Sequence, residues 1–206
     1  MTAQRTDPPR QLPLDLGHGT GYSRDELVVS GTNNQAAALV DRWPDWPSPV
    51  VVLAGPAGSG KTHLAAIWRV RANAVAVDAR RIGDSITSLG ARPALLLTAR
   101  RFPSAWGVSL PDLASRLKAA ATVEIHEPDD LLLAGVITKL FADRQVEVEP
   151  HVVQYLVRRI ERSLATAMRV VERLDRTALE RKMPITRALA AETINAMDEG
   201  QREFEI

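Results

Sequence analysis

Hydrophobic positions divide the chain into two parts with different periodicities. In the first part, residues 50–54 are continuously apolar and mostly β-branched, which is typical of a strand buried on both faces. The pattern predicts further strands and several helices: strands at 74–77, 94–97 and 122–125, and helices at 33–42, 62–71 and 111–117. This alternation predicts an α/β fold built on a parallel sheet.

Beyond about residue 127 the apolar residues follow helical spacing alone. Four amphipathic segments are predicted as helices, at 129–143, 151–162, 164–181 and 186–197. We therefore expect an α/β domain over residues 27–126 and a small all-α domain over residues 127–206. Residues 1–26 carry prolines and glycines around a short apolar patch, which predicts a flexible tail.

Composition excludes several classes of protein. The 206 residues are 45% hydrophobic with a net charge of +1, so the chain can bury a core and shows no excess of basic residues for coating nucleic acid or a membrane surface. There is no cysteine, which excludes disulfides and thiol chemistry and suits a cytoplasmic protein. The four histidines lack metal-ligand spacing. We find no secretory leader and no uncharged apolar run of ~18 residues, so no membrane span is expected.

The segment after the first strand carries the clearest chemical motif. It matches the phosphate-binding loop pattern G-x-x-x-x-G-K-T and reads Gly55, Pro56, Ala57, Gly58, Ser59, Gly60, Lys61, Thr62. In such loops backbone N–H groups and the helix N-terminus surround the phosphates, the lysine reaches the β and γ phosphates, and the threonine hydroxyl binds Mg²⁺. The chain lacks the guanine-reading sequence N-K-x-D, which favours ATP or ADP over GTP.

Three segments resemble the DnaA/Hda family of AAA+ ATPases, and the resemblance extends over about residues 11–198. They are residues 27–36, the loop with Lys61, Thr62, His63 and Leu64 after it, and the segment Leu-Pro-Asp-Leu-Ala-Ser-Arg-Leu at 110–117. The resemblance implies an AAA+ domain followed by a helical lid. It also implies that His63 joins the nucleotide site, that Thr98 is a polar sensor, and that Arg116 is an arginine finger acting on a neighbouring subunit's nucleotide.

The tail resembles the clamp-binding peptide of Hda-like proteins, with Gln11, Leu12, Leu14 and Leu16 in a Q-L-x-L-x-L pattern. An extended peptide can place alternate apolar side chains in a partner's pocket, although the pattern alone fits equally a tail packed on its own domain. The resemblance implies that the sliding clamp and DnaA are partners, that DNA contact is indirect, and that the protein is cytoplasmic and associated with the nucleoid through the clamp. A homodimer is left open.

The sequence departs from the family in two places. The acidic strand that would hold Mg²⁺ and polarise water is not found, and it is expected to be missing between about Ala91 and Leu97. In the lid, Ala165 occupies the position of the family's sensor arginine, with Arg162 and Arg169 out of register. These departures predict weak or no intrinsic ATPase activity. The basic stretch 151–187 is interleaved with acidic residues, so a solvated face is expected there.

The resulting hypothesis is a negative regulator of replication initiation. It would bind nucleotide and the sliding clamp, and it would supply Arg116 in trans to promote hydrolysis of DnaA-bound ATP. One alternative is a DnaA-like adaptor that recruits another factor without promoting hydrolysis. A second is a P-loop small-molecule kinase with a helical lid, which is disfavoured because no set of acceptor-orienting carboxylates is recognisable.

Overall fold

A parallel three-stranded sheet forms the centre of the N-terminal half. The computed structural model describes residues 23–74 and 94–203, and the strands are β1 (Val50–Ala54), β2 (Leu95–Ala99) and β3 (Ala121–Glu124). β1 lies in the middle, with Val50 paired to Leu95 on one side and Val51 paired to Ala121 on the other. Since all pairs are parallel, the three carboxyl ends lie at one edge of the sheet, where α/β folds bind their ligands.

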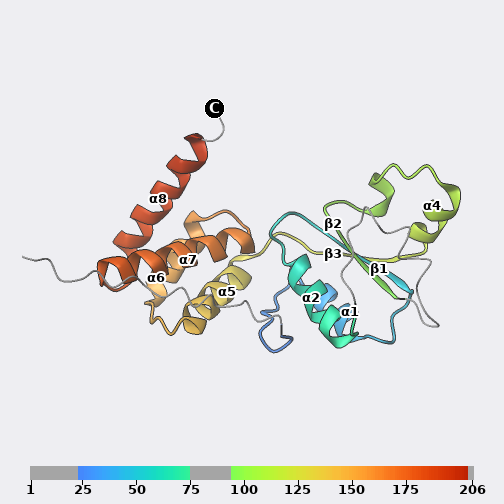
Figure 1. Cartoon of the computed structure of the whole chain (residues 1–206), viewed down its shortest axis with the longest axis horizontal. Helices are drawn as coiled ribbons and strands as arrows, with labels where there is room; N and C mark the ends of the chain where they lie inside the picture. The colour runs from blue at the N-terminus through green and yellow to red at the C-terminus, as the bar shows by residue number, and fades with distance from the viewer. Residues whose placement is uncertain (1–22, 75–93, 204–206) are drawn as a thin grey trace, which may run out of the picture.

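Helices α1 (Asn34–Asp41) and α2 (Lys61–Arg71) pack on one face of this sheet (Figure 1). Val51 and Leu53 of β1 are fully buried in a cluster with residues of both helices, because alternate strand residues share a face. Val52 is fully buried as well, so the central strand is covered on both sides, as its continuous apolar pattern predicts. The sheet therefore holds the segment after β1 rigidly in place.

Three tryptophans close the outer edge of the α1–α2 layer. Trp46 stacks on Trp68, with 5.1 Å between the ring centroids. Trp43 meets both rings edge-on, at centroid distances of 5.0 and 5.6 Å. The indole N–H of Trp46 donates to the carbonyl of Leu39 at 2.8 Å. These contacts fix the proline-rich connection between α1 and β1 against the helices.

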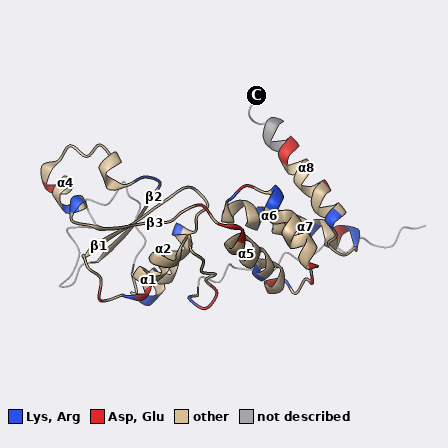
Figure 2. Cartoon of the chain, turned by 180° about the vertical axis from the view of Figure 1, so that it is seen from behind, with Lys and Arg blue, Asp and Glu red and all other residues tan. Residues whose placement is uncertain are grey.

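A short 3-10 helix, η2 (Pro103–Ala105), and α4 (Pro111–Lys118) connect β2 to β3. No residue of α4 is buried. Figures 1 and 2 show α4 at the end of the molecule opposite the helical half. This helix is therefore held by its flanking strands more than by packing.

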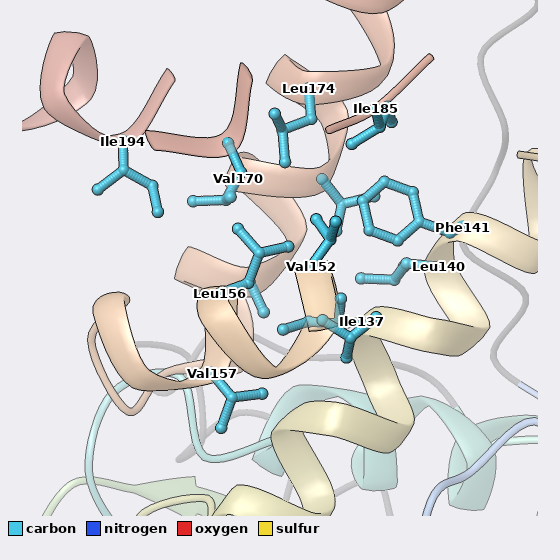
Figure 3. Packing of buried hydrophobic residues seen from close by; sticks show 14 of the residues in the cluster. Ile137, Leu140, Phe141, Val152, Leu156, Val157, Val170, Leu174, Ile185 and Ile194 are labelled. Carbon is cyan, nitrogen blue, oxygen red and sulfur yellow. The ribbon is translucent and has the colours of Figure 1, made fainter. Parts of the chain in front are cut away.

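The C-terminal half consists of four helices: α5 (Asp130–Asp143), α6 (Pro150–Arg159), α7 (Leu164–Arg181) and α8 (Arg187–Glu203). Their apolar faces meet in one core, shown in Figure 3, to which Ile137, Phe141, Leu156, Val170 and Leu174 contribute. All five of these side chains are at most 3% exposed. This burial accounts for the amphipathic spacing of the sequence in this half.

Local sequence signals set the starts of these helices. The Asp129 carboxylate accepts from the Leu132 N–H at 2.7 Å and caps α5, and the Ser163 hydroxyl accepts from the Thr166 N–H at 3.3 Å and caps α7. Pro150 opens α6 at the first helical position, where its missing N–H costs nothing. α7 ends where Lys182 adopts φ +52°.

The α/β class predicted from the sequence is confirmed, and the helical pattern after residue 127 corresponds to helices throughout the described residues. The strand predicted at 74–77 lies outside the described residues except for Ala74, and so do residues 91–93 of the interval 91–97 in which the acidic strand was expected to be missing. β2 lies directly beside β1 over five residue pairs, so the described sheet is continuous. None of the described helices is both long and apolar enough to cross a membrane.

Candidate functional site: the phosphate-binding loop and the lid

The loop of residues 55–60 connects the carboxyl end of β1 to the first turn of α2, as the motif requires. The Gly55 N–H donates to the Ala99 carbonyl of β2 at 3.1 Å, which anchors the start of the loop to the neighbouring strand. Gly60 is the N-cap of α2 and has φ +94°, and Lys61 and Thr62 form the first turn. The free N–H groups of this turn and the helix dipole make the position suited to an anion.

Gly58 is required by its conformation and by its surroundings. Its φ is +72°, and a Cβ atom there would lie 2.0 Å from the Ser163 Oγ and 2.9 Å from the Ser163 Cβ. The Gly58 carbonyl also accepts a hydrogen bond from the Leu164 N–H at 2.8 Å. The phosphate-binding loop and the start of lid helix α7 are therefore in direct contact.

The Lys61 side chain is folded back over the loop. Its ammonium donates to the carbonyls of Gly55, at 2.8 Å, and Pro56, and it lies 3.2 Å from the Ser59 Oγ. Partial burial, together with the positive charge of Arg100, lowers the pKa of Lys61. A phosphate group in the loop would replace neutral carbonyl acceptors with charged oxygens, which bind an ammonium more strongly.

A cavity of about 270 Å³ lies between the loop, the segment before α1, and the lid. In Figure 1 that N-terminal segment runs between α2 and α5. The cavity lining has a polar part and a largely apolar part. The loop and the first turn of α2, from Gly58 to His63, supply the polar part, and the segment before α1 and the lid helices supply the rest: Glu26, Leu27, Val28, Leu132, Val136, Lys139, Leu140, Leu164, Ala165 and Met168.

His63, in the first turn of α2, lines the cavity and is about half buried. Burial lowers the pKa of this imidazole, and the nearby Lys139 charge lowers it further, whereas Glu26 and the Ser23 backbone act in the opposite direction. His63 is therefore neutral at neutral pH. His63 lines the cavity, and its predicted role in nucleotide binding stays a prediction.

Known structures share this arrangement of a sheet domain and a helical lid. Domain III of the replication initiation protein DnaA from Thermotoga maritima has a TM-score of 0.70 and 14% identity, and the similarity covers 91% of this chain and 98% of that one. A replication initiator DnaA bound to AMPPCP and single-stranded DNA has a TM-score of 0.64 and 16% identity, over 80% of this chain and 68% of that one. The RuvB Holliday junction branch migration motor of Thermotoga maritima reaches 0.62 with 18% identity, over the same shares.

The sequence of the lid narrows the resemblance further than the fold does, because it matches one family model. Residues 136–193, from α5 to α8, match the family described as "Hda, lid domain". Over these residues the chain resembles the Hda lid, and its overall fold is that of DnaA domain III. No curated protein sequence is significantly similar to it.

Among the lid residues that the structure describes, no arginine lines the cavity. Ala165 lines it, whereas Arg162 forms an ion pair with Asp130 at 2.7 Å and Arg169 donates to the Thr166 hydroxyl at 3.1 Å. Lys139 of α5 is the cation that the described part of the lid contributes to the cavity lining. Position 165, where the family would have a sensor arginine, is an alanine, and the cation at the cavity is Lys139 from a different helix.

Two further predicted residues, Thr98 and Arg116, do not line the cavity. Thr98 is exposed on β2, opposite Leu53 of β1, and does not line the cavity. Arg116 lies on α4 with 66% of its side chain exposed, and its Nε donates to Asp112 at 2.9 Å. Gln11, Leu12, Leu14 and Leu16 lie outside the described residues.

Sequence reasoning missed three charged residues near the site: Glu26, Arg100 and Lys139. Arg100 follows β2 by one residue, at the sheet edge where the loop begins, and its charge reaches Lys61. That position could have been found, since it follows directly from the strand prediction. Glu26 and Lys139 are 113 positions apart in the numbering, and only the closed lid brings them to the same cavity.

Proposed function

We propose that this chain binds ATP or ADP between the phosphate-binding loop and the lid. The observation that carries the proposal is the single cavity that joins Gly58–Thr62 to an apolar wall, since phosphates suit the loop and a planar base suits the apolar part. DnaA bound to AMPPCP has the same fold. We also propose the division into a tail at 1–26, an AAA+ domain at 27–126 and a lid domain at 127–206.

Mg²⁺ would bind together with the nucleotide. Thr62 is exposed at the second position of α2 and lines the cavity, so its hydroxyl can serve as one ligand. Among the described residues, no group of three or more His, Asp or Glu side chains could hold a metal ion. The nucleotide phosphates would therefore supply most of the negative charge around Mg²⁺. We expect weak or no intrinsic hydrolysis.

The larger function that we propose is negative control of replication initiation. In this hypothesis the tail residues Gln11, Leu12, Leu14 and Leu16 bind the sliding clamp, and Arg116 promotes hydrolysis of ATP on DnaA. The position of Arg116 supports a role in trans: α4 lies at the opposite end of the molecule from the lid, and no part of α4 lines the chain's own cavity (Figure 2). The Nε bond to Asp112 steadies the side chain, and no hydrogen bond from its terminal amino groups is seen among the described residues.

Tethering would make this arrangement effective. Binding to a clamp on DNA raises the effective concentration of the regulator near DnaA, so hydrolysis would follow clamp loading. DNA contact would then be indirect. Basic and acidic residues alternate along the lid helices (Figure 2), and three of the lid arginines pair with Glu172, Asp175 or Glu192, which favours a solvated face over a DNA-binding one.

The deciding experiment measures hydrolysis of DnaA-bound ATP with DNA-loaded clamp. Arg116→Ala should reduce stimulation at least tenfold, because arginine fingers contribute ~10³ to 10⁵ in rate in GTPase systems. Arg116→Lys should restore little, since an ammonium lacks the guanidinium fork. Arg173→Ala, an exposed arginine on α7, is the matched control and should behave as wild type.

Two preconditions make the result interpretable. The variants must shift their melting temperature with ADP as wild type does, and they must bind the clamp equally. Full stimulation by Arg116→Ala would contradict the finger role and favour the adaptor alternative. Phosphotransfer to a metabolite by the wild-type chain would favour the kinase alternative instead.

A further inference from the structure

The largely apolar part of the cavity lining contains a carboxylate oxygen that lacks a hydrogen bond. Glu26 precedes Leu27 and Val28 in the segment that lines the cavity, and its Oε2 atom is buried. No donor in the described residues forms a hydrogen bond with this atom. The Glu26 side chain as a whole is 38% exposed, so solvent reaches the rest of the carboxylate, whereas the buried Oε2 keeps an unused acceptor that a ligand in the cavity can fill.

The nearest cation offsets the charge of Glu26 without satisfying it. The Lys139 ammonium lies 3.9 Å from Oε2, beyond hydrogen-bond distance, whereas it donates to Asp143 at 2.6 Å. Lys139 is therefore held toward its own helix. The acceptor capacity of Oε2 is therefore left unused by this pair, on a residue that lines the cavity.

The surroundings of Glu26 restrict what can donate to it. Leu27, Val28, Leu132 and Val136 give the same part of the cavity an apolar wall, which suits a flat aromatic ring. The phosphate-binding loop in the polar part fixes where the phosphates of a bound nucleotide would lie. The group that reaches Glu26 is then the edge of the base.

We propose that Glu26 is a specificity-determining residue that accepts a hydrogen bond from the exocyclic amino group of adenine. This inference rests on the proposed binding of ATP or ADP. The amino group at C6 is a donor, whereas guanine carries an acceptor oxygen there, which would face the carboxylate without a proton. Glu26 therefore selects the base, while the loop binds the phosphates.

The test compares two ligands that differ only in the amino group, ADP and purine riboside 5′-diphosphate, by calorimetry on the full chain. Wild type should bind ADP at least about tenfold more tightly, since a hydrogen bond to a charged group contributes ~1.5–3 kcal/mol. Glu26→Ala should bind the two ligands within about twofold of each other. Glu147→Ala, an exposed glutamate in the connection between α5 and α6, should retain the wild-type ratio.

The outcomes separate this inference from the proposed function. If wild type binds neither ligand, nucleotide binding itself is wrong. If it binds both equally, or if Glu26→Ala keeps the preference, then Glu26 does not read the base. GDP bound more tightly than ADP by wild type would overturn the assignment to adenine. Should Glu26→Ala fail to fold, Glu26→Leu, which keeps much of the side-chain volume without an acceptor, is measured in its place and should also bind the two ligands within about twofold of each other.

Discussion

The contact between the phosphate-binding loop and the lid predicts a compensating pair of substitutions. Gly58→Ala places a methyl group 2.0 Å from the Ser163 Oγ and forces alanine into φ +72°. The left-handed conformation costs ~1–2 kcal/mol, and separating the lid from the loop loses the Leu164–Gly58 hydrogen bond, which contributes ~0.5–1.5 kcal/mol. We expect a loss of about 2–3 kcal/mol, or ~4–12 °C in melting temperature for a chain of this size.

Ser163→Gly should relieve the collision. It removes both Oγ and Cβ, after which the nearest atom of residue 163 is the Cα at 3.3 Å from the added methyl. On its own it should cost only a few tenths of a kcal/mol, because glycine is an acceptable N-cap for α7. In the double variant the φ strain remains but the lid can close again. The two changes should therefore couple favourably by ~1 kcal/mol.

Thermal melts of the wild type, both single variants and the double variant measure this coupling. ADP titrations should follow the same order, since the cavity needs the lid in place. If the two changes add within ~0.3–0.5 kcal/mol, the loop and α7 are not in contact in solution, and the closed arrangement is wrong. Ser163→Ala is a useful intermediate, because it keeps the Cβ that would lie 2.9 Å from the new methyl.

Two further predictions concern charged groups around the cavity. Burial lowers the pKa of His63, so below about pH 6.5 the unfolded chain binds a proton more readily than the folded chain does. The free energy of unfolding should therefore be highest above that pH and decrease as the pH falls, by at most ~1.4 kcal/mol per pH unit. His63→Gln should flatten the dependence of melting temperature between pH 7.5 and 5, and equal slopes would contradict this account. Arg100→Ala should weaken ADP binding by ~2- to 5-fold at low salt, because the charge of Arg100 acts at the loop's lysine, and the effect should fade at high salt. AMP binding that is weakened as much as ADP binding would show that Arg100 does not act on the phosphates.

Local sequence determined much of this molecule because its signals act over short distances. The continuous apolar run of β1, the glycine loop and the helix after it are adjacent in sequence, so the phosphate-binding motif predicts its own geometry. The amphipathic pattern predicted the start of α7 at Leu164, and the structure shows that Ser163 caps it. Element ends were less well determined. α8 continues to Glu203, beyond the predicted end at 197; Asp198 and Glu199, which follow the predicted end, are exposed and so extend no apolar pattern.

Tertiary structure alone decided what surrounds the loop. The sequence does not show that Ser163 and Leu164 meet Gly58, or that Glu26 and Lys139 share a cavity, because these residues come from segments far apart in the chain. Their contact depends on how the lid core, built around Phe141 and Leu174, orients α5 and α7 against the sheet domain. Side-chain periodicity specifies which face of a helix is buried but not the angle at which two packed bodies meet. The loop could therefore be predicted from the sequence, whereas the shape and charge of the cavity that it shares with the lid followed only from the tertiary structure.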